Sequence, residues 1–380
     1  MKSDNFAKAK QVNDLVYDVL QGTQHLRSMA EKHLPRFERE DYADYRKRLN
    51  RATLTPILQE TVSTVVGRIF SNDIQIDSAL PLDSVNELND SFSVVLRDVV
   101  TDAVKFGCSY VFVNYVDGLP QFEHIPYASV KKIEEDGLRL KSIAYTKGGK
   151  DIEIGRGYVS IDKVSLPIIM HGKVIDFCPV VPFNINAITP SVGSSPYAEL
   201  AALCIKLWQA DSAQDNIVSY LRQPLLLASG ISANDGVEVS AGNLLIVPKD
   251  ADVRYVEHSG NAVAVGFDHI DRIKQDCLLA GAAISSLSKI SMTDGQAEEE
   301  KTKTTARVLS WCEKIEDCAA NALQIAADYV GLKDGGSVSL RENVLNEKSK
   351  VSLDDVVNLV QNGILSADEA RNHLASLKLI

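Results

Sequence analysis

The sequence has no long apolar run and no excess of positive charge. Its longest apolar stretches, such as residues 224–228 and 244–248, are much shorter than the roughly 20 residues that a membrane-spanning helix needs. We therefore expect no membrane partner. The formal net charge of −11 disfavours tight, sequence-independent binding of DNA, because such binding depends on Lys and Arg side chains that neutralise phosphates. An acidic chain can still let DNA pass without holding it.

Motifs for catalysis and metal binding are also lacking. None of the six cysteines forms a C-x-x-C pair or has a histidine at zinc-ligand spacing, so we expect reduced thiols that pack as small apolar side chains in a cytosolic protein. The first ten residues are polar, so no signal peptide is expected. The chain has no P-loop, G-x-G-x-x-G, G-x-S-x-G or H-E-x-x-H pattern. The sequence thus predicts no enzyme, no cofactor and no metal. An enzyme whose site is assembled from distant residues is kept as a third hypothesis.

The residues up to 195 predict helices followed by a β region. Helical spacing of apolar residues indicates helices over 5–33, 56–70 and 91–107, with a break at Pro35 and a charged break over 36–50. Gly107 is expected to end the third helix. Residues 109–183 alternate between apolar and polar side chains and contain repeated Gly turns, which predicts an antiparallel meander. Helices and antiparallel strands in separate runs are typical of an α+β fold.

The second half predicts two helices on either side of short strands, and then a longer helix. The first helix covers about 197–222 and the second about 262–279, with short strands in 224–258. A segment rich in small residues, 280–296, precedes a helix over 297–330. The tail contains two further short helices in 352–379. A pair of long helices with a β module between them buries its apolar residues poorly alone, which suggests packing against other copies of the chain.

The apolar residues expected to be buried follow helical spacing in all three of these helices. They are Leu200, Leu203, Cys204, Leu207, Trp208 and Ile217 in the first, Val265, Ile270, Ile273, Cys277 and Leu278 in the second, and Val308, Cys312, Ile315, Ala319, Ala322, Ala326 and Tyr329 in the third.

Three blocks of the sequence resemble a tailed-phage portal family that is catalogued as a domain of unknown function. Residues 33–70 contain an LP…E…Y..RL.RA stretch, and the helix that follows it ends in VGRIF. Residues 298–331 resemble the long helix of that family, and residues 355–374 resemble its C-terminal block. The chain is short for a portal, so a minimal crown and no C-terminal barrel are expected.

The resemblance implies a portal fold of α+β class with a defined order of parts. These are a wing (1–195), a first stem helix (196–223), a clip (224–260), a second stem helix (261–284), a tunnel loop (285–297), a long wing or crown helix (298–335) and crown helices (336–380).

It also implies a non-enzymatic ring of twelve copies at one capsid vertex, assembled in the host bacterial cytoplasm and kept in the virion. The ring would conduct double-stranded DNA during packaging and ejection. Its partners would be the terminase large subunit, a head–tail adaptor, and the major capsid and scaffolding proteins. The alternative is another head–tail adaptor ring, although adaptors are usually shorter and lack two stem helices followed by a long third one.

Two sets of residues are candidates for contacts within this ring. The outward charges of the stem helices sum to slightly acidic, which suits DNA that slides. The candidates for the DNA channel lie in the tunnel loop and are Ser288, Lys289, Ser291 and Thr293. The candidates for the clip interface are Leu225, Leu226, Leu227, Leu245, Val247 and Arg254.

Overall fold

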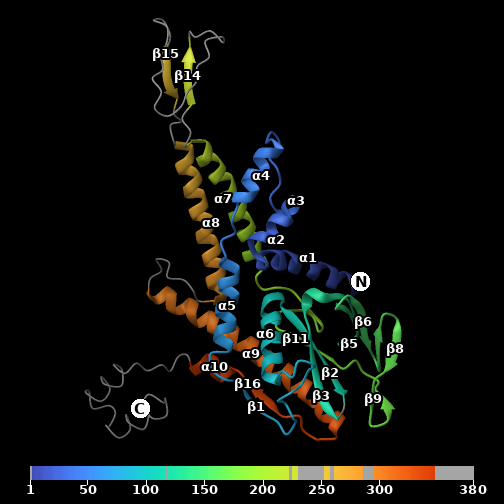
Figure 1. Ribbon diagram of the computed structural model, residues 1–380. Helices are drawn as coiled ribbons and strands as arrows, with labels where there is room; N and C mark the ends of the chain where they lie inside the picture. Colours follow the sequence, from blue (N-terminus) through green and yellow to red (C-terminus); the bar gives the residue numbers. More distant parts are fainter. Residues whose placement is uncertain are drawn as a thin grey trace, which may run out of the picture. The chain divides into compact units, whose positions relative to one another are not determined.

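The computed structural model describes residues 2–116, 118–221, 225–229, 252–256, 261–285 and 294–346. They form helices and antiparallel sheets, so the fold is α+β as predicted (Figure 1). The chain divides into two compact units. The first, Met1–Val16, Gln59–Ala198 and Ala282–Ile380, is called the sheet unit here. The second, Tyr17–Leu58 and Glu199–Gly281, is called the hairpin unit.

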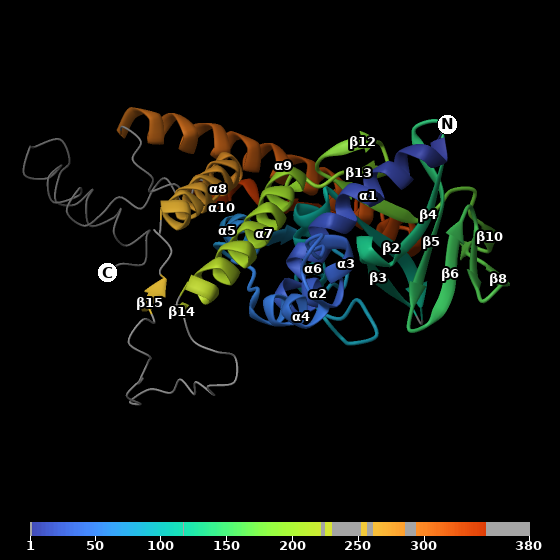
Figure 2. The ribbon, with the colours of Figure 1, turned by 90° about the horizontal axis from the view of Figure 1, so that it is seen from above.

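A three-stranded antiparallel sheet lies at the centre of the sheet unit. Its order is β11 (Val180–Asn184), β2 (Cys108–Val116) and β3 (Leu119–Ile125). Helices α6 (Phe92–Phe106) and α9 (Asp294–Val330) both pack against it (Figure 2). Gly107 ends α6 with a φ of 81°, as the sequence predicted. A Cβ atom at Gly107 would overlap the backbone of Ser194, so both the turn and the close packing require glycine.

A second, five-stranded sheet in this unit is a meander in chain order. It runs through β4 (Val130–Asp136), β5 (Arg139–Lys147), β6 (Lys150–Gly155), β7 (Tyr158–Ile161) and β8 (Val164–Pro167). The sequence predicted an antiparallel meander over 109–183; the antiparallel pairing of consecutive strands is confirmed, but the strands form two main sheets and not one. After the five strands the chain returns as β11 to pair with β2, with Val181 opposite Val111. Alternation along a strand indicates which faces are buried but not which strand is the partner.

Short elements complete the sheet unit. They are α5 (Ile57–Ile69), the 3-10 turn Tyr127–Ser129, β9 (Ile169–Met170), β10 (Lys173–Val174), β12 (Ala187–Thr189), β13 (Val192–Gly193) and α10 (Arg341–Asn346). The sequence missed β1 (Gln75–Asp77) and β16 (Ser337–Ser339), which pair with each other. The helices predicted over 352–379 lie outside the described residues. By contrast, all seven residues of the predicted α9 stripe are buried, which confirms that prediction.

The hairpin unit is mostly helical. The predicted helix over 5–33 is confirmed but interrupted, as α1 (Lys2–Leu20), of which the part up to Val16 belongs to the sheet unit, followed by α2 (Gly22–Ser28) and α3 (Ala30–His33) in the hairpin unit. The charged break predicted over 36–50 is partly wrong, because α4 (Tyr42–Arg51) is a helix that begins at an Asp41 side-chain cap. Two long helices, α7 (Ala198–Leu221) and α8 (Asn261–Ser285), complete this unit together with β14 (Leu225–Ser229) and β15 (Asp252–Val256).

Candidate functional site

Helices α7 and α8 lie side by side in the hairpin unit (Figure 1). The Gln214 side-chain amide of α7 donates a hydrogen bond of 2.9 Å to the Val263 carbonyl of α8. A methyl group at Gly266 would overlap the Gln214 side chain, so glycine lets the helices approach closely here. A hydrogen bond with Cys277 and burial raise the pKa of the Cys204 thiol, so Cys204 stays protonated between the two helices. The buried side chains of these helices include Cys204, Leu207 and Trp208 on α7 and Ile270, Ile273 and Cys277 on α8.

The apolar sets predicted for these helices are only partly correct. Ile217, Val265 and Leu278 were expected to be buried, but their exposed fractions are 47%, 68% and 40%. Phe267 and Leu279, which the prediction did not include, are exposed as well. The reason is geometric. Only one narrow stripe of the α8 surface is buried, so the side chains on the other sides of the helix are exposed to solvent. The hairpin therefore presents apolar side chains that the described residues do not cover.

The exposed charges of α7 and α8 sum to slightly acidic, as the sequence predicted. Burial raises the pKa of Asp211, and the nearby carboxylates of Asp215 and Asp271 raise it further, while Lys274 acts in the opposite direction. Clustered carboxylates on α7 and α8 give a surface that does not attract phosphate strongly. The exposed charged residues of the two helices include Lys206, Asp215, Asp268, Asp271, Arg272 and Asp276.

A buried ion pair explains several residues of the LP…E…Y..RL motif. The Arg48 guanidinium, 1% exposed, donates hydrogen bonds of 2.7 Å to both carboxylate oxygens of Glu40. It also donates to the Pro35 carbonyl at 3.1 Å and to the Ser212 hydroxyl of α7 at 3.4 Å. The Tyr45 hydroxyl donates to the Leu34 carbonyl. The hydrogen bonds from Arg48 hold the pKa of Glu40 below its usual value, so these motif residues fasten the segment before α4 within the hairpin unit.

A second buried carboxylate, Asp18, is surrounded by three basic side chains. His33 Nε2 lies 2.8 Å from its carboxylate, Lys32 Nζ 2.7 Å and His25 Nε2 3.0 Å. Burial opposes the ionisation of Asp18, but the hydrogen bonds from Lys32 and the two histidines outweigh it and lower its pKa. The cluster joins α1 to α2 and α3, and Gln209 of α7 donates to the His33 carbonyl. We interpret it as structural, because its carboxylate is already saturated with donors.

The structure describes four of the six candidate clip residues. Leu225, Leu226 and Leu227 lie in β14, which pairs antiparallel with β15, and Leu227 is opposite Arg254. The prediction of strands in this segment is confirmed for β14 and β15. Leu245 and Val247 lie outside the described residues.

The candidate tunnel-loop residues Ser288, Lys289, Ser291 and Thr293 also lie outside them. The structure does describe the helices on either side, and the segment between them is shorter than the predicted tunnel loop. Helix α8 continues to Ser285 and α9 already begins at Asp294, so the loop predicted up to residue 297 overlaps the first turn of α9.

One polar cluster tests the hypothesis of an enzyme. Ser109, His124 and Asp102 meet in the sheet unit, with the Ser109 hydroxyl 2.9 Å from His124 Nε2 and 3.1 Å from Asp102 Oδ2. In a hydrolytic triad the serine and the carboxylate bind different ring nitrogens of the histidine. Here Asp102 also lies nearest Nε2, at 3.5 Å. Ser109 is fully buried, and Asp102 accepts the Tyr127 backbone N–H, so the cluster serves the packing of the sheet.

Two further expectations concern thiols and metals. All six cysteines are free thiols, as predicted, and five of them are buried. Among the residues that the structure describes, no group of three or more His, Cys, Asp or Glu side chains could hold a metal ion. Within that same part of the chain, no helix combines the length and the apolar character that crossing a membrane requires.

The chain was compared with family models, curated proteins and solved structures. Residues 196–330 match a family described as Domain of unknown function (DUF4055). A search of curated proteins gives no match.

Solved structures give several matches at low sequence identity. One is a chain from the neck of an empty GTA particle computed with C6 symmetry, with a TM-score of 0.53 and 12% identity over 91% of this chain and 97% of that chain. A chain from the neck of a native GTA particle computed with C12 symmetry has a TM-score of 0.51 and 12% identity over 84% and 89%. A chain from the virion of a native gene transfer agent particle has a TM-score of 0.51 and 11% identity over 94% and 99%. At this identity the likeness shows a shared fold.

Proposed function

We propose that this chain is the portal subunit of a phage-like particle, a non-enzymatic component of a ring at the capsid vertex. One observation carries the proposal: the fold matches chains of GTA neck and virion structures over nearly the whole length of both chains. The order of elements agrees with it, since α7, β14, β15, α8 and α9 follow one another as stem, clip, stem and long helix would. The symmetry in the description of one neck structure, C12, supports a ring of twelve copies.

The ring would use the exposed apolar residues of the stem hairpin. Val265, Phe267, Leu278 and Leu279 on α8 and Ile217 on α7 would pack against neighbouring copies, which would remove them from water. The acidic remainder of both helices would then face a channel through which double-stranded DNA slides without being held.

The central experiment combines native mass spectrometry with electron microscopy of the purified full chain. Rings of about twelve copies with a central hole are expected. A chain that stays monomeric at micromolar concentration in moderate salt would contradict the proposal.

A head–tail adaptor would also form rings, so a second measurement is needed to separate the two functions. Particles assembled without this chain should fail to package DNA if it is the portal. If it is an adaptor, they should package DNA but fail to retain it or to attach tails.

The clip would dock the terminase large subunit during packaging and an adaptor afterwards. In this proposal, β14, β15 and the strand predicted around Leu245 form a sheet that can extend between subunits. Proline at Leu245 removes a backbone donor from that sheet. Leu245→Pro is expected to give damaged rings or rings that no longer bind the adaptor, measured by electron microscopy and pull-down. Normal rings with normal binding would show that this strand does not pair.

The tunnel loop would touch the DNA through Lys289, its only basic residue. Twelve copies would present a belt of about twelve ammonium groups, which can brush phosphates without reading sequence. Lys289→Glu is expected to leave head assembly intact but to reduce packaged or retained DNA, scored separately by head counts and genome length. Wild-type DNA content would remove Lys289 from the mechanism.

A further inference from the structure

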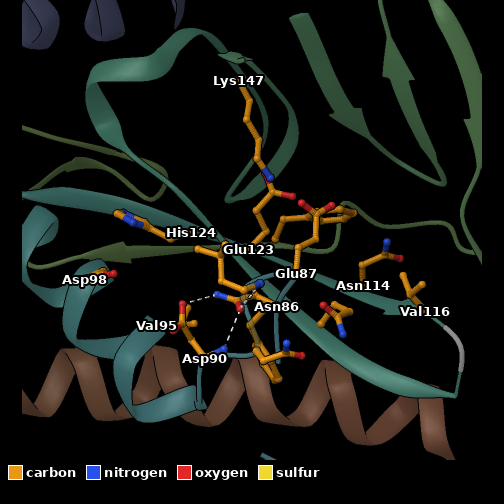
Figure 3. Close-up of a pocket in the computed structure, with 15 residues that line it drawn as sticks. Asn86, Glu87, Asp90, Val95, Asp98, Asn114, Val116, Glu123, His124 and Lys147 are labelled. Carbon is orange, nitrogen blue, oxygen red and sulfur yellow. Dashed lines mark hydrogen bonds and ion pairs between the residues drawn. The ribbon is translucent and has the colours of Figure 1, made fainter. Parts of the chain in front are cut away.

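The sheet unit contains a groove that the proposed ring does not use. It has a volume of about 610 Å³ and lies between the loop 86–90 and the strands β2 and β3, beside α6 (Figure 3). Its floor is apolar, since Val95, Phe112 and Phe122 line it and are buried. At its rim Leu88 is 80% exposed and Val116 is 45% exposed. An apolar side chain of a ligand could therefore pack against the buried floor and against the exposed side chains of Leu88 and Val116.

The loop that carries Leu88 is held in place by its own hydrogen bonds. The Asn86 side-chain oxygen accepts from the backbone N–H groups of Leu88 and Asp90, and its amide donates to the Asp90 carboxylate, each at 3.0 Å (Figure 3). The backbone of Val85 also donates to the Asp90 carbonyl at 2.8 Å. A loop fixed in this way presents an exposed leucine at little entropic cost to binding, which is a property of interface anchors.

The charge of the groove is mainly negative. Its lining includes the carboxylates of Glu87, Asp90, Asp98 and Glu123 against the single ammonium of Lys147. Lys147 is already paired with Glu123 at 3.1 Å. Glu87 and Asp98 are exposed, and neither carboxylate has a side-chain hydrogen bond or an ion pair within the residues that the structure describes. Two carboxylates without partners beside an apolar floor complement a ligand that carries positive charge around an apolar side chain.

We infer that this groove is a docking site for a basic peptide segment of another protein, one with Lys or Arg side chains on both sides of a central apolar residue. The apolar residue would lie over Phe112 and Phe122 against Leu88, and the flanking cations would pair with Glu87 and Asp98. The inference does not depend on the proposed contacts between copies, because those lie on α7, α8 and the clip while every residue used here belongs to the sheet unit.

The test uses the full-length chain and three fluorescent pentapeptides. The first has a central leucine flanked by lysine and arginine, the second replaces the leucine with glycine, and the third keeps the leucine but has glutamates on both sides. Fluorescence anisotropy should show that the first peptide binds, the second more weakly, and the third not at all. Raising the salt concentration should weaken the binding of the first two.

Substitutions then locate the binding. The double variant Glu87→Gln and Asp98→Asn should weaken the first peptide about tenfold, since two ion pairs are lost. Leu88→Ser should weaken the first peptide and leave the second unchanged. A matched control, Asp83→Asn with Asp176→Asn, removes the same charge from exposed positions outside the groove lining and should have no effect.

Three results would overturn the inference. They are no binding of the basic peptide at millimolar concentration, equal binding to the groove and control variants, and equal binding of the leucine and glycine peptides. The last result would indicate a general cation site. Circular dichroism of each variant checks that the fold is retained, and the exposed positions of all substituted side chains make that the expected outcome.

Discussion

Helices α8 and α9 are both long, but they use their apolar residues in opposite ways. In α9 every residue of the predicted stripe, from Val308 to Tyr329, is buried within its own chain. In α8, among the larger apolar side chains that the structure describes, Ile270, Ile273 and Cys277 are deeply buried, while Val265 and Phe267 are exposed. The same helical periodicity thus occurs in α9, whose apolar stripe is covered by the rest of the chain, and in α8, where part of the apolar surface is left exposed to solvent. An open apolar helix face is what lateral packing of copies would require.

The interiors of the two units differ in a related way. The sheet unit is built on apolar contacts between α6, α9 and the β2 sheet. The hairpin unit buries both partners of an ion pair, Arg48 and Glu40, and also the Asp18 carboxylate, whereas in the sheet unit the buried Glu316 pairs with an Arg341 that is half exposed. A buried ion pair adds little net stability while it is intact but costs much when one partner is lost. The two units should therefore respond differently to substitution and to pH.

The largest effect is expected for Arg48→Ala. It leaves Glu40 buried without its bidentate partner, which should cost about 3–5 kcal/mol of unfolding free energy. Urea unfolding followed by circular dichroism measures this. Arg46→Ala on the exposed side of α4 is the matched control and should change the free energy by less than about 0.5 kcal/mol. If both variants have the same midpoint, the ion pair does not hold the hairpin unit.

A comparable test of the sheet unit is Ile315→Ala. Ile315 lies fully buried in the middle of α9, so the cavity should cost about 2–4 kcal/mol. Asp317→Ala, two residues further along at an exposed position, is the control. Unlike the loss from Arg48→Ala, the loss from Ile315→Ala should not depend on salt or pH. A strong pH dependence would show that α9 packing is coupled to a titrating group.

Asp18→Asn tests the pH response of the hairpin unit. Hydrogen bonds to a charged group are each worth about 1.5–3 kcal/mol, so the variant should be less stable at neutral pH by roughly that amount. Because the pKa of Asp18 is lowered in the folded chain, its contribution is present above the ordinary Asp range and is lost as the pH falls through the folded pKa. The stability difference between wild type and variant should therefore shrink below about pH 4. A constant difference from pH 7 to pH 3 would contradict this.

How far the sequence predicted the molecule depends on the range of the interactions involved. The α+β class, the bounds of α5, α6 and α7, the Gly107 terminus and the α9 stripe were all readable, because periodicity and caps are local. The return of β11 to β2, the pairing of β1 with β16 and the helix α4 within a charged segment were not. The two strand pairings depend on partners that are distant in the sequence. Helix α4 depends on the burial of the Arg48 side chain, which pairs with Glu40.

The candidate site was predicted less completely than the fold. The strands β14 and β15 were expected, but the exposure of Val265 and Leu278 was not, because spacing shows which residues share a helix face and not whether a neighbour covers it. The groove beside Leu88 gave no sequence signal beyond a turn-like run of Asn and Asp, since its floor comes from two strands and a helix.

The smallest effect on the subunit, and the most informative about function, is expected for Val265→Ser combined with Phe267→Ser. Both side chains are exposed on α8, at 68% and 49%, so the unfolding free energy of the isolated subunit should change by less than about 0.5 kcal/mol. In a ring, by contrast, each copy would bury them against its neighbour, and a serine at either position would lose that burial in every interface. Native mass spectrometry should then show monomers or small oligomers where the wild type forms large rings. Val94→Ser, which also replaces an exposed apolar residue but lies on α6 in the sheet unit, is the control and should form rings normally. If the double variant assembles like the wild type, the open face of α8 is not the surface that joins the copies, and the contrast between α8 and α9 loses its functional meaning.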